Sequence, residues 1–165
     1  MKMESNQNQK FYEMLKEFDT AMLVTRLTDR LCARPMAIAK LEENCNISFL
    51  TSEFTEMVKE IEANPIVQVT CQRDHGSYLA LSGMAKTSQD HAEIAKVWKP
   101  SYEVWFPKGI NDPELCLISV TSTQGEYWDN RGVNKIKYLF NAVKAFATGS
   151  KPNISEGNQH GEVRL

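Results

Sequence analysis

The sequence has few of the residues on which common metal and catalytic sites depend. It contains three histidines and four cysteines, and no two cysteines form a C-x-x-C pattern. It also lacks the motifs G-x-G-x-x-G, G-x-x-x-x-G-K-[ST], G-x-S-x-G and H-E-x-x-H. These absences exclude the standard signatures of dinucleotide, P-loop, hydrolase and metalloprotease sites. We therefore expect reduced thiols, no metal site and no catalytic residue that the sequence itself identifies.

An excess of charge of one sign and long apolar runs are also missing. The chain has 19 basic and 21 acidic residues, a net charge of -2 and a pI near 6.0. It thus has no global basic field to attract nucleic acid or an anionic membrane, and we expect neither partner. No apolar run approaches the ~20 residues of a membrane span, and the first ten residues are polar where a signal peptide is apolar. We expect a cytoplasmic protein.

The composition that is present suits one globular domain. The 165 residues are 42% hydrophobic and 24% charged, an ordinary balance for a soluble fold. We predict a single domain over residues 1–148, ending in an amphipathic helix at residues 134–147. From residue 149 to residue 165 the sequence turns to Gly, Ser, Asn, Pro and charge, which predicts a mobile tail.

Short runs of apolar and β-branched residues, separated by turn residues, predict β-strands. The predicted strands are residues 21–28, 32–40, 47–50, 66–72 and 77–87, followed by a closing strand pair or one long bent strand over residues 115–121 and 125–128. Helices are too few for repeated βαβ units, so we predict a mainly β fold, a small barrel with helices packed outside. Gly83, inside one strand, indicates a bulge or the close approach of another backbone or a ligand.

Two hydroxyl side chains, Thr51 and Ser52, follow one predicted strand and precede a predicted helix at residues 55–63. The unpaired N–H groups and the dipole of a first helical turn favour an anion. Arg34, on the preceding predicted strand, could add a bidentate cationic partner. This arrangement suggests a phosphate-bearing ligand. The alternative is that the hydroxyls only cap the helix and that Arg34 forms a surface ion pair.

An aromatic segment at residues 100–113 stands out because proline and glycine predict a loop there. Tyr102, Trp105 and Phe106 occupy positions at which solvated polar residues are expected. Aromatic side chains of this size seldom remain in water without a role. They could cover a ligand, seal one end of the barrel as a hydrophobic plug, or form a dimer contact.

Five short motifs follow one another along the chain. They are Arg34-Pro35-Met36, then Phe49-Leu50-Thr51-Ser52, then Tyr78 with Gly83, then Trp98 with Trp105-Phe106-Pro107, Gly109 and Asp112-Pro113, and finally Tyr127-Trp128. In this combination the sequence resembles the general stress protein branch of the pyridoxamine 5'-phosphate oxidase-like, FMN-binding split barrels, from Phe11 to Asn130. The resemblance implies a split β-barrel of the Greek-key, FMN-binding type. It also implies a homodimer with FMN at the subunit interface.

The resemblance assigns roles to particular residues, which fall into three groups. Those expected to hold the phosphate and ribityl chain are Arg34, Thr51 and Ser52; those bordering the flavin ring are Met36 and Leu50; those covering the ring from the second subunit are Trp98, Trp105 and Phe106. Pro35, between Arg34 and Met36, is also expected to contact the cofactor. An apolar ring wall with a few polar anchors suits a flavin.

One departure from the family pattern concerns the charge around the phosphate. Met57 stands where relatives commonly carry a lysine, and Glu53 stands where another basic residue is frequent. The phosphate would then depend on Arg34, the helix N-terminus and either Lys59 or Arg73.

The function implied is that of an FMN-dependent oxidoreductase working with a small-molecule electron donor or acceptor. The flavin supplies the reactive atom, so the protein need not provide an acid/base pair or a nucleophile. The alternative is a stress-associated protein that binds or buffers FMN without turnover.

Overall fold

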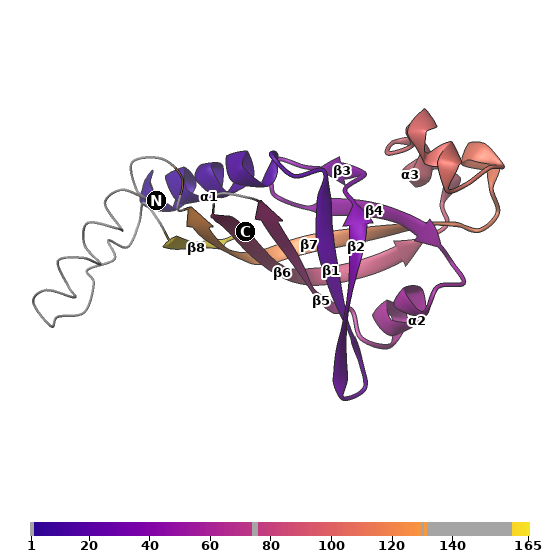
Figure 1. The fold of residues 1–165 in the computed structure, drawn as a ribbon, viewed down its shortest axis with the longest axis horizontal. Helices are drawn as coiled ribbons and strands as arrows, with labels where there is room; N and C mark the ends of the chain where they lie inside the picture. The colour runs from indigo at the N-terminus through magenta and orange to yellow at the C-terminus, as the bar shows by residue number, and fades with distance from the viewer. Residues whose placement is uncertain (1, 74–75, 130, 132–159) are drawn as a thin grey trace, which may run out of the picture.

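The computed structural model describes residues 2–73, 76–129, 131 and 160–165. Its centre is one antiparallel sheet that curls into a half barrel, with strand order β2-β1-β5-β6-β7-β4-β3 and β8 paired to β7 outside this path (Figure 1). The strands are β1 Thr20–Leu27, β2 Arg30–Ala37, β3 Lys40–Leu41, β4 Ile47–Ser52, β5 Ile66–Arg73, β6 Ser77–Ser88, β7 Leu115–Asp129 and β8 His160–Arg164. The mainly β fold class predicted from the sequence is confirmed.

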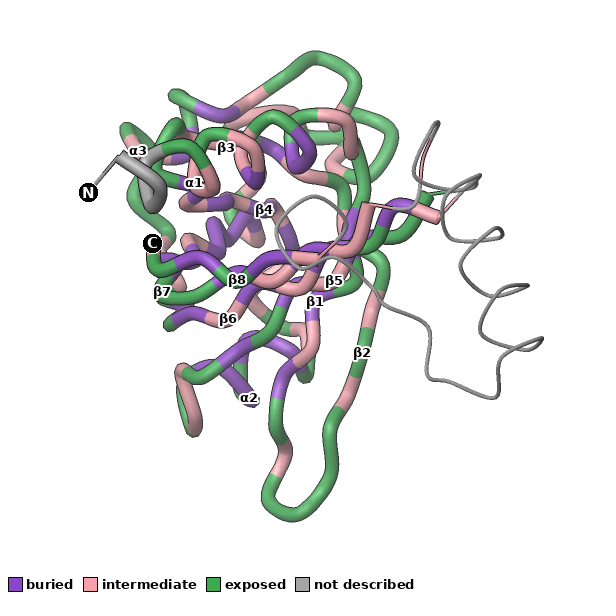
Figure 2. The backbone as a smooth tube through the Cα atoms, turned by 90° about the vertical axis from the view of Figure 1, so that its left-hand side faces the viewer, coloured by how far each residue is buried: buried purple, intermediate pink, exposed green. Residues whose placement is uncertain are grey.

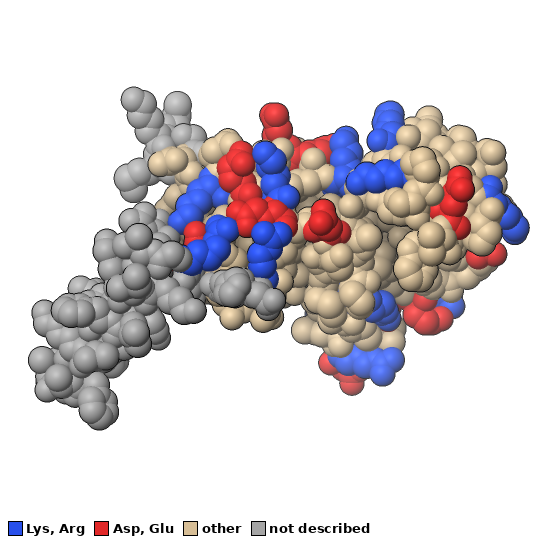
Figure 3. All heavy atoms as spheres, turned by 45° about the horizontal axis from the view of Figure 1, so that its top comes forward, with Lys and Arg blue, Asp and Glu red and all other residues tan. Residues whose placement is uncertain are grey.

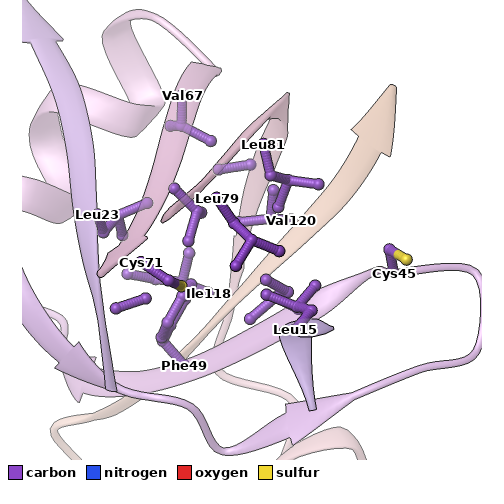
Figure 4. Packing of buried hydrophobic residues seen from close by; sticks show 14 of the residues in the cluster. Leu15, Leu23, Cys45, Phe49, Val67, Cys71, Leu79, Leu81, Ile118 and Val120 are labelled. Carbon is purple, nitrogen blue, oxygen red and sulfur yellow. The ribbon is translucent and has the colours of Figure 1, made fainter. Parts of the chain in front are cut away.

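The core lies on the concave face of the sheet, where alternate side chains of each strand point inward. In β4, for example, Ile47, Phe49 and Thr51 are buried while the residues between them are partly exposed. Figure 4 shows inward side chains from β1, β4, β5, β6 and β7 pointing toward one another, among them Leu23, Phe49 and Ile118. Along the tube in Figure 2, burial is concentrated in the sheet and is lowest at the tip of the β1–β2 hairpin.

Helices cover the open sides of the half barrel. Helix α1, Lys2–Leu15, packs Phe11, Met14 and Leu15 against the sheet beside β7 and β8. Helix α2, Glu56–Ala63, lies against β1 and β6. Helix α3, His91–Ala95, is capped by Asp90, whose side chain accepts from the N–H groups of Ala92 and Glu93. Two short 3-10 turns follow at the same end of the molecule, η1 Pro100–Val104 and η2 Gly109–Asn111 (Figure 1).

The long strand β7 settles two expectations. The two segments predicted as a strand pair or one bent strand form a single strand of 15 residues. Its register with β6 shifts between Ser82 and Gly83, so the predicted irregularity at Gly83 is confirmed. A Cβ atom at Gly83 would overlap the carbonyl oxygen of Thr121, which explains why the strand carries glycine there.

Strand β8 lies within the residues 149–165 for which the sequence predicted a mobile tail. His160–Arg164 pairs with β7, and the His160 Nε2 atom lies 2.7 Å from Glu126 Oε1 while its ring stacks on Trp128. Only Gly161 and Val163 of this strand are buried. Two small inward residues give too weak an alternation to distinguish a strand from a polar tail. The predicted helix at residues 134–147 and the tail residues 149–159 lie outside the described residues.

Candidate functional site

A pocket of about 380 Å³ opens where β2, β4 and η1 meet. Its walls are Pro35, Met36, Ala37, Leu50, Thr51, Ser52, Tyr102, Trp105 and Phe106. Seven of these are residues that the sequence assigned to a cofactor site, from three separate motifs. The fold therefore gathers into one pocket most of the side chains that the sequence singled out.

Strands β2 and β4 position the wall residues that precede the aromatic segment. Ala39 N–H donates to the Ser48 carbonyl oxygen at 2.8 Å, which draws the end of β2 against β4. Alternation along β4 turns Leu50 and Ser52 toward the aromatic segment, whereas Thr51 is only 8% exposed on the opposite, core-facing side. The pocket floor is thus apolar, with the Ser52 hydroxyl group at the end of β4.

The aromatic segment forms the remaining wall by packing on a second hydrophobic cluster. Tyr102 and Phe106 join Trp98 and Leu50 over a buried base of Ala39, Ile94, Val97, Leu115 and Leu117. The ring centroids of Trp98 lie 5.8 Å from those of Tyr102 and 6.4 Å from those of Phe106. Trp98 does not line this pocket of its own chain. It stands behind the two aromatic residues that do, and supports them.

Trp105 and Phe106 line this pocket together with strand residues of their own chain. The sequence predicted that they would reach the site from a second subunit. The Trp105 and Phe106 N–H groups both donate to the Tyr102 carbonyl oxygen at 2.9 Å, which turns the chain back over β4. Trp105 keeps 77% of its surface exposed at the pocket rim.

Arg34 is paired with a carboxylate in this arrangement. Its two terminal nitrogens donate to the two carboxylate oxygens of Glu60 at 2.7 Å and 2.9 Å, and one of them also donates to Thr25 Oγ1 at 3.0 Å. Glu60 is 2% exposed, and the paired Arg34 guanidinium and the Thr25 hydroxyl lower the pKa of its carboxyl group to about 2. Arg34 is absent from the pocket wall. This contact is an ion pair, the kind of contact that the sequence offered as the alternative to anion binding.

The hydroxyl pair does not stand at the helix start either. Helix α2 begins at Glu56 with Thr55 as its N-cap, and Glu53 and Phe54 separate it from Ser52. Ser52 Oγ donates instead to Glu114 Oε2 at 3.2 Å. A carboxylate therefore borders the polar end of the pocket.

The other cations that the sequence proposed are engaged elsewhere. Lys59 pairs with Glu56 at 2.7 Å on the surface, and Arg73 pairs with Glu17 at 3.2 Å near the end of α1. Met57, at the position of the family lysine, is buried in the main core. Basic and acidic groups lie close together on the face shown in Figure 3. Neither Lys59 nor Arg73 lines the pocket.

The sequence did not identify Tyr102 and Ala37 as wall residues, or Glu60 and Glu114 as neighbours of the site. Burial raises the pKa of Tyr102. Tyr102 belongs to the aromatic segment, which was the available signal. Glu60 and Glu114 gave no signal in the sequence, because an acidic residue in a helix or a loop is expected to be exposed to solvent.

A separate group of possible metal ligands lies on β7 and β8. Glu126, His160 and Glu162 each bring one ligand atom within 4.8 Å of the other two. Two of these three residues, His160 and Glu126, already contact each other at 2.7 Å. We assign no metal to this group.

The fold is that of a split-barrel protein, with a pocket beside strands β2 and β4. The chain matches the pyridoxamine 5'-phosphate oxidase-like family over residues 6–153 and belongs to that family. The predicted family and split-barrel fold class are thereby confirmed. No curated protein sequence matches the chain.

Solved structures with the same fold are described as general stress proteins. A candidate general stress protein 26 from Jannaschia sp. CCS1 is 26% identical, with a TM-score of 0.71 and coverage of 98% of this chain and 99% of that one. A protein related to general stress protein 26, from Clostridium acetobutylicum, is 21% identical, with a TM-score of 0.67 and coverage of 78% and 98%. A general stress FMN/FAD binding protein from Xanthomonas citri is 24% identical, with a TM-score of 0.67 and coverage of 78% and 92%. Among the helices that the structure describes, none is long and apolar enough to span a bilayer.

Proposed function

We propose that this protein is an FMN-binding flavoprotein of the general stress protein type and acts as a flavin-dependent oxidoreductase. The observation that carries the proposal is the convergence of Met36, Leu50 and Phe106 with Ser52 of β4 in one pocket. A volume of about 380 Å³ falls within the usual range for small-molecule sites. Family membership and the description of the Xanthomonas citri protein support a flavin as the ligand.

The pocket fits the ring of a flavin better than its phosphate. Met36 and Leu50 provide an apolar floor, and Trp105 and Phe106 provide aromatic faces of the kind that stack on flat ligands. Among the described residues, those lining the pocket carry no charged side chain. Ser52 and the backbone groups at the end of β4 would therefore meet the ribityl chain and the phosphate.

The chain's own contribution to the reaction would be binding, orientation and exclusion of water. When bound, FMN supplies hydride and electron transfer, and this chemistry belongs to the cofactor. Leu50, Tyr102 and Phe106 would shield one side of the ring from water, since all three pack in the second hydrophobic cluster. Trp105, exposed at the rim, leaves the other side accessible to an electron donor or acceptor.

A second candidate function is a carrier that binds or buffers FMN without turnover. It is favoured by the scarcity of titratable groups in the pocket wall, where Tyr102 is the sole one among the described residues. Such a wall holds a ring but offers no carboxyl or imidazole group to exchange protons with a substrate.

A homodimer would cover the outer face of the sheet. Met22 on β1, Ile66 on β5, and Tyr78 and Met84 on β6 are large apolar side chains exposed on strands whose alternate residues fill the core. Exposed apolar residues gathered on one face mark an interaction surface. We propose a second copy of this chain as its partner, in keeping with the family resemblance.

The test is the absorption spectrum of the purified protein, followed by titration with NADH or NADPH. A yellow protein that is bleached by a donor and reoxidised in air supports the oxidoreductase. A yellow protein that is inert to both donors supports the carrier. A colourless protein that binds no added FMN overturns both functions.

A further inference from the structure

We infer that this pocket, if it binds flavin as proposed, selects its ligand by the ring and not by the phosphate. It would then bind riboflavin about as tightly as FMN. The inference rests on the proposed function and concerns the class of ligand that the same site accepts. It follows from the positions of two carboxylates, those of Glu114 and Glu60.

Glu114 accepts a hydrogen bond from Ser52, a polar side chain of the pocket wall, although Glu114 itself does not line the pocket. Its Oε2 atom accepts the Ser52 hydroxyl hydrogen at 3.2 Å, and its backbone carbonyl oxygen accepts from the Glu53 N–H at 2.8 Å. The second contact fixes the start of β7 beside the end of β4, so the carboxylate is held close to the pocket. A phosphate bound through Ser52 would have to displace this carboxylate or lie next to it.

Glu60 removes the cation that would compensate for that repulsion. Both terminal nitrogens of Arg34 donate to the carboxylate of Glu60, and this carboxylate also accepts from Thr25 Oγ1 at 2.5 Å. Moving Arg34 to a ligand would leave a carboxylate that is 2% exposed without its charge partner. Breaking such a buried pair is strongly unfavourable.

Among the described residues, no replacement cation lines the pocket. An FMN phosphate carries a charge of about -1.5 to -2 at neutral pH, by analogy with other phosphate monoesters. Beside Glu114, this charge gains hydrogen bonds but also meets electrostatic repulsion. The net contribution of the phosphate to binding is therefore small, and the apolar and aromatic wall supplies the affinity.

The test compares riboflavin with FMN by quenching of flavin fluorescence on the full chain freed of flavin. We expect the two dissociation constants to agree within about three-fold near 20 mM NaCl. Raising NaCl to about 0.5 M should tighten FMN binding and leave riboflavin unchanged, because salt screens repulsion. Glu114→Gln should tighten FMN binding about ten-fold without changing riboflavin binding. Glu62→Gln, on the exposed face of α2, is the matched control and should change neither.

Three outcomes overturn the inference in distinguishable ways. FMN bound more than about ten-fold tighter than riboflavin by the unaltered chain shows that a cation does reach the phosphate. FMN binding that weakens as salt is added would also show that a cation reaches the phosphate. This measurement needs no substitution, so it remains possible if Glu114→Gln fails to fold. If neither flavin binds, the proposed function itself is overturned.

Discussion

The carboxylate of Glu60 accepts two hydrogen bonds from the guanidinium of Arg34, at 2.7 Å and 2.9 Å. Glu60 comes from α2 and Arg34 from β2, while Thr25 of β1 donates to the same carboxylate. The three residues join one helix and two strands around a buried charge. Arg34, which the sequence offered for ligand binding, is thus one half of an ion pair that ties α2 to the β1–β2 hairpin.

This pair predicts a loss of stability in acid. The Arg34 guanidinium lowers the pKa of Glu60 from its ordinary value of 4.5 to about 2. Because the pKa is lower in the folded state, the stabilisation is complete above pH 4.5 and is lost as the pH falls from 4.5 toward 2. The loss should approach roughly 3 kcal/mol of unfolding free energy, measured by urea unfolding at several pH values.

Replacing the acid tests the same contact at neutral pH. Glu60→Gln should cost about 2–3 kcal/mol at pH 7, below the range for fully buried pairs because Arg34 is partly exposed and can turn to water. It should also abolish this part of the acid dependence. Glu62→Gln, two positions further along α2 and exposed, should leave the stability within about 0.5 kcal/mol of the parent. An unchanged acid dependence in Glu60→Gln would show that other carboxyl groups cause it.

Trp105→Ala should weaken flavin binding without weakening the fold. The indole lines the pocket but is 77% exposed, so its removal takes little from the core. Loss of an aromatic contact of about 1.4 kcal/mol corresponds to a dissociation constant raised about ten-fold. Val104→Ala is the matched control, because Val104 is adjacent, equally exposed and absent from the pocket wall. Equal affinities for the two variants would exclude Trp105 from the site.

Thiol titration should separate one cysteine from the other three. Burial raises the pKa of Cys45 to about 11 and that of Cys71 to about 12, and it also raises the pKa of Cys116. Cys32 is the one cysteine that is not buried. At pH 8 the native protein should therefore release one equivalent of thionitrobenzoate rapidly from Ellman's reagent, and all four in denaturant. Rapid reaction of a second thiol would show that the core opens locally.

Gly161→Ala tests whether β8 packs on β7. A Cβ atom at position 161 would collide with the ring of Tyr127, which is fully buried. Overpacking of this kind costs about 1–3 kcal/mol of unfolding free energy. Glu162→Ala, at the next position and exposed, should have little effect. If both variants were as stable as the parent, β8 would contribute nothing to the fold.

The strands were predictable because their side-chain alternation is local and strong. β1, β5 and β6 were predicted to within one residue at each end, and Gly83 was assigned its irregularity. β8 was missed because a five-residue strand with two inward residues becomes recognisable only when its partner β7 is known.

The pocket was predictable only in its apolar part. Motifs at Met36, Leu50 and Phe106 are distinctive in sequence, and the fold brings them together. The charge arrangement was not predictable, because Arg34 meets Glu60 across 26 positions and Ser52 meets Glu114 across 62. Pairings at such separations depend on strand order, which no local pattern encodes.

The exposed indole of Trp105 at the pocket rim also provides an intrinsic fluorescence signal for binding. The other two tryptophans are less exposed, since Trp98 contacts aromatic rings and Trp128 stacks on His160. A guest that shields Trp105 from water will move its ultraviolet emission toward shorter wavelengths, while Trp128 supplies a steady background. Arrival and departure of any colourless guest can therefore be followed without attaching a dye.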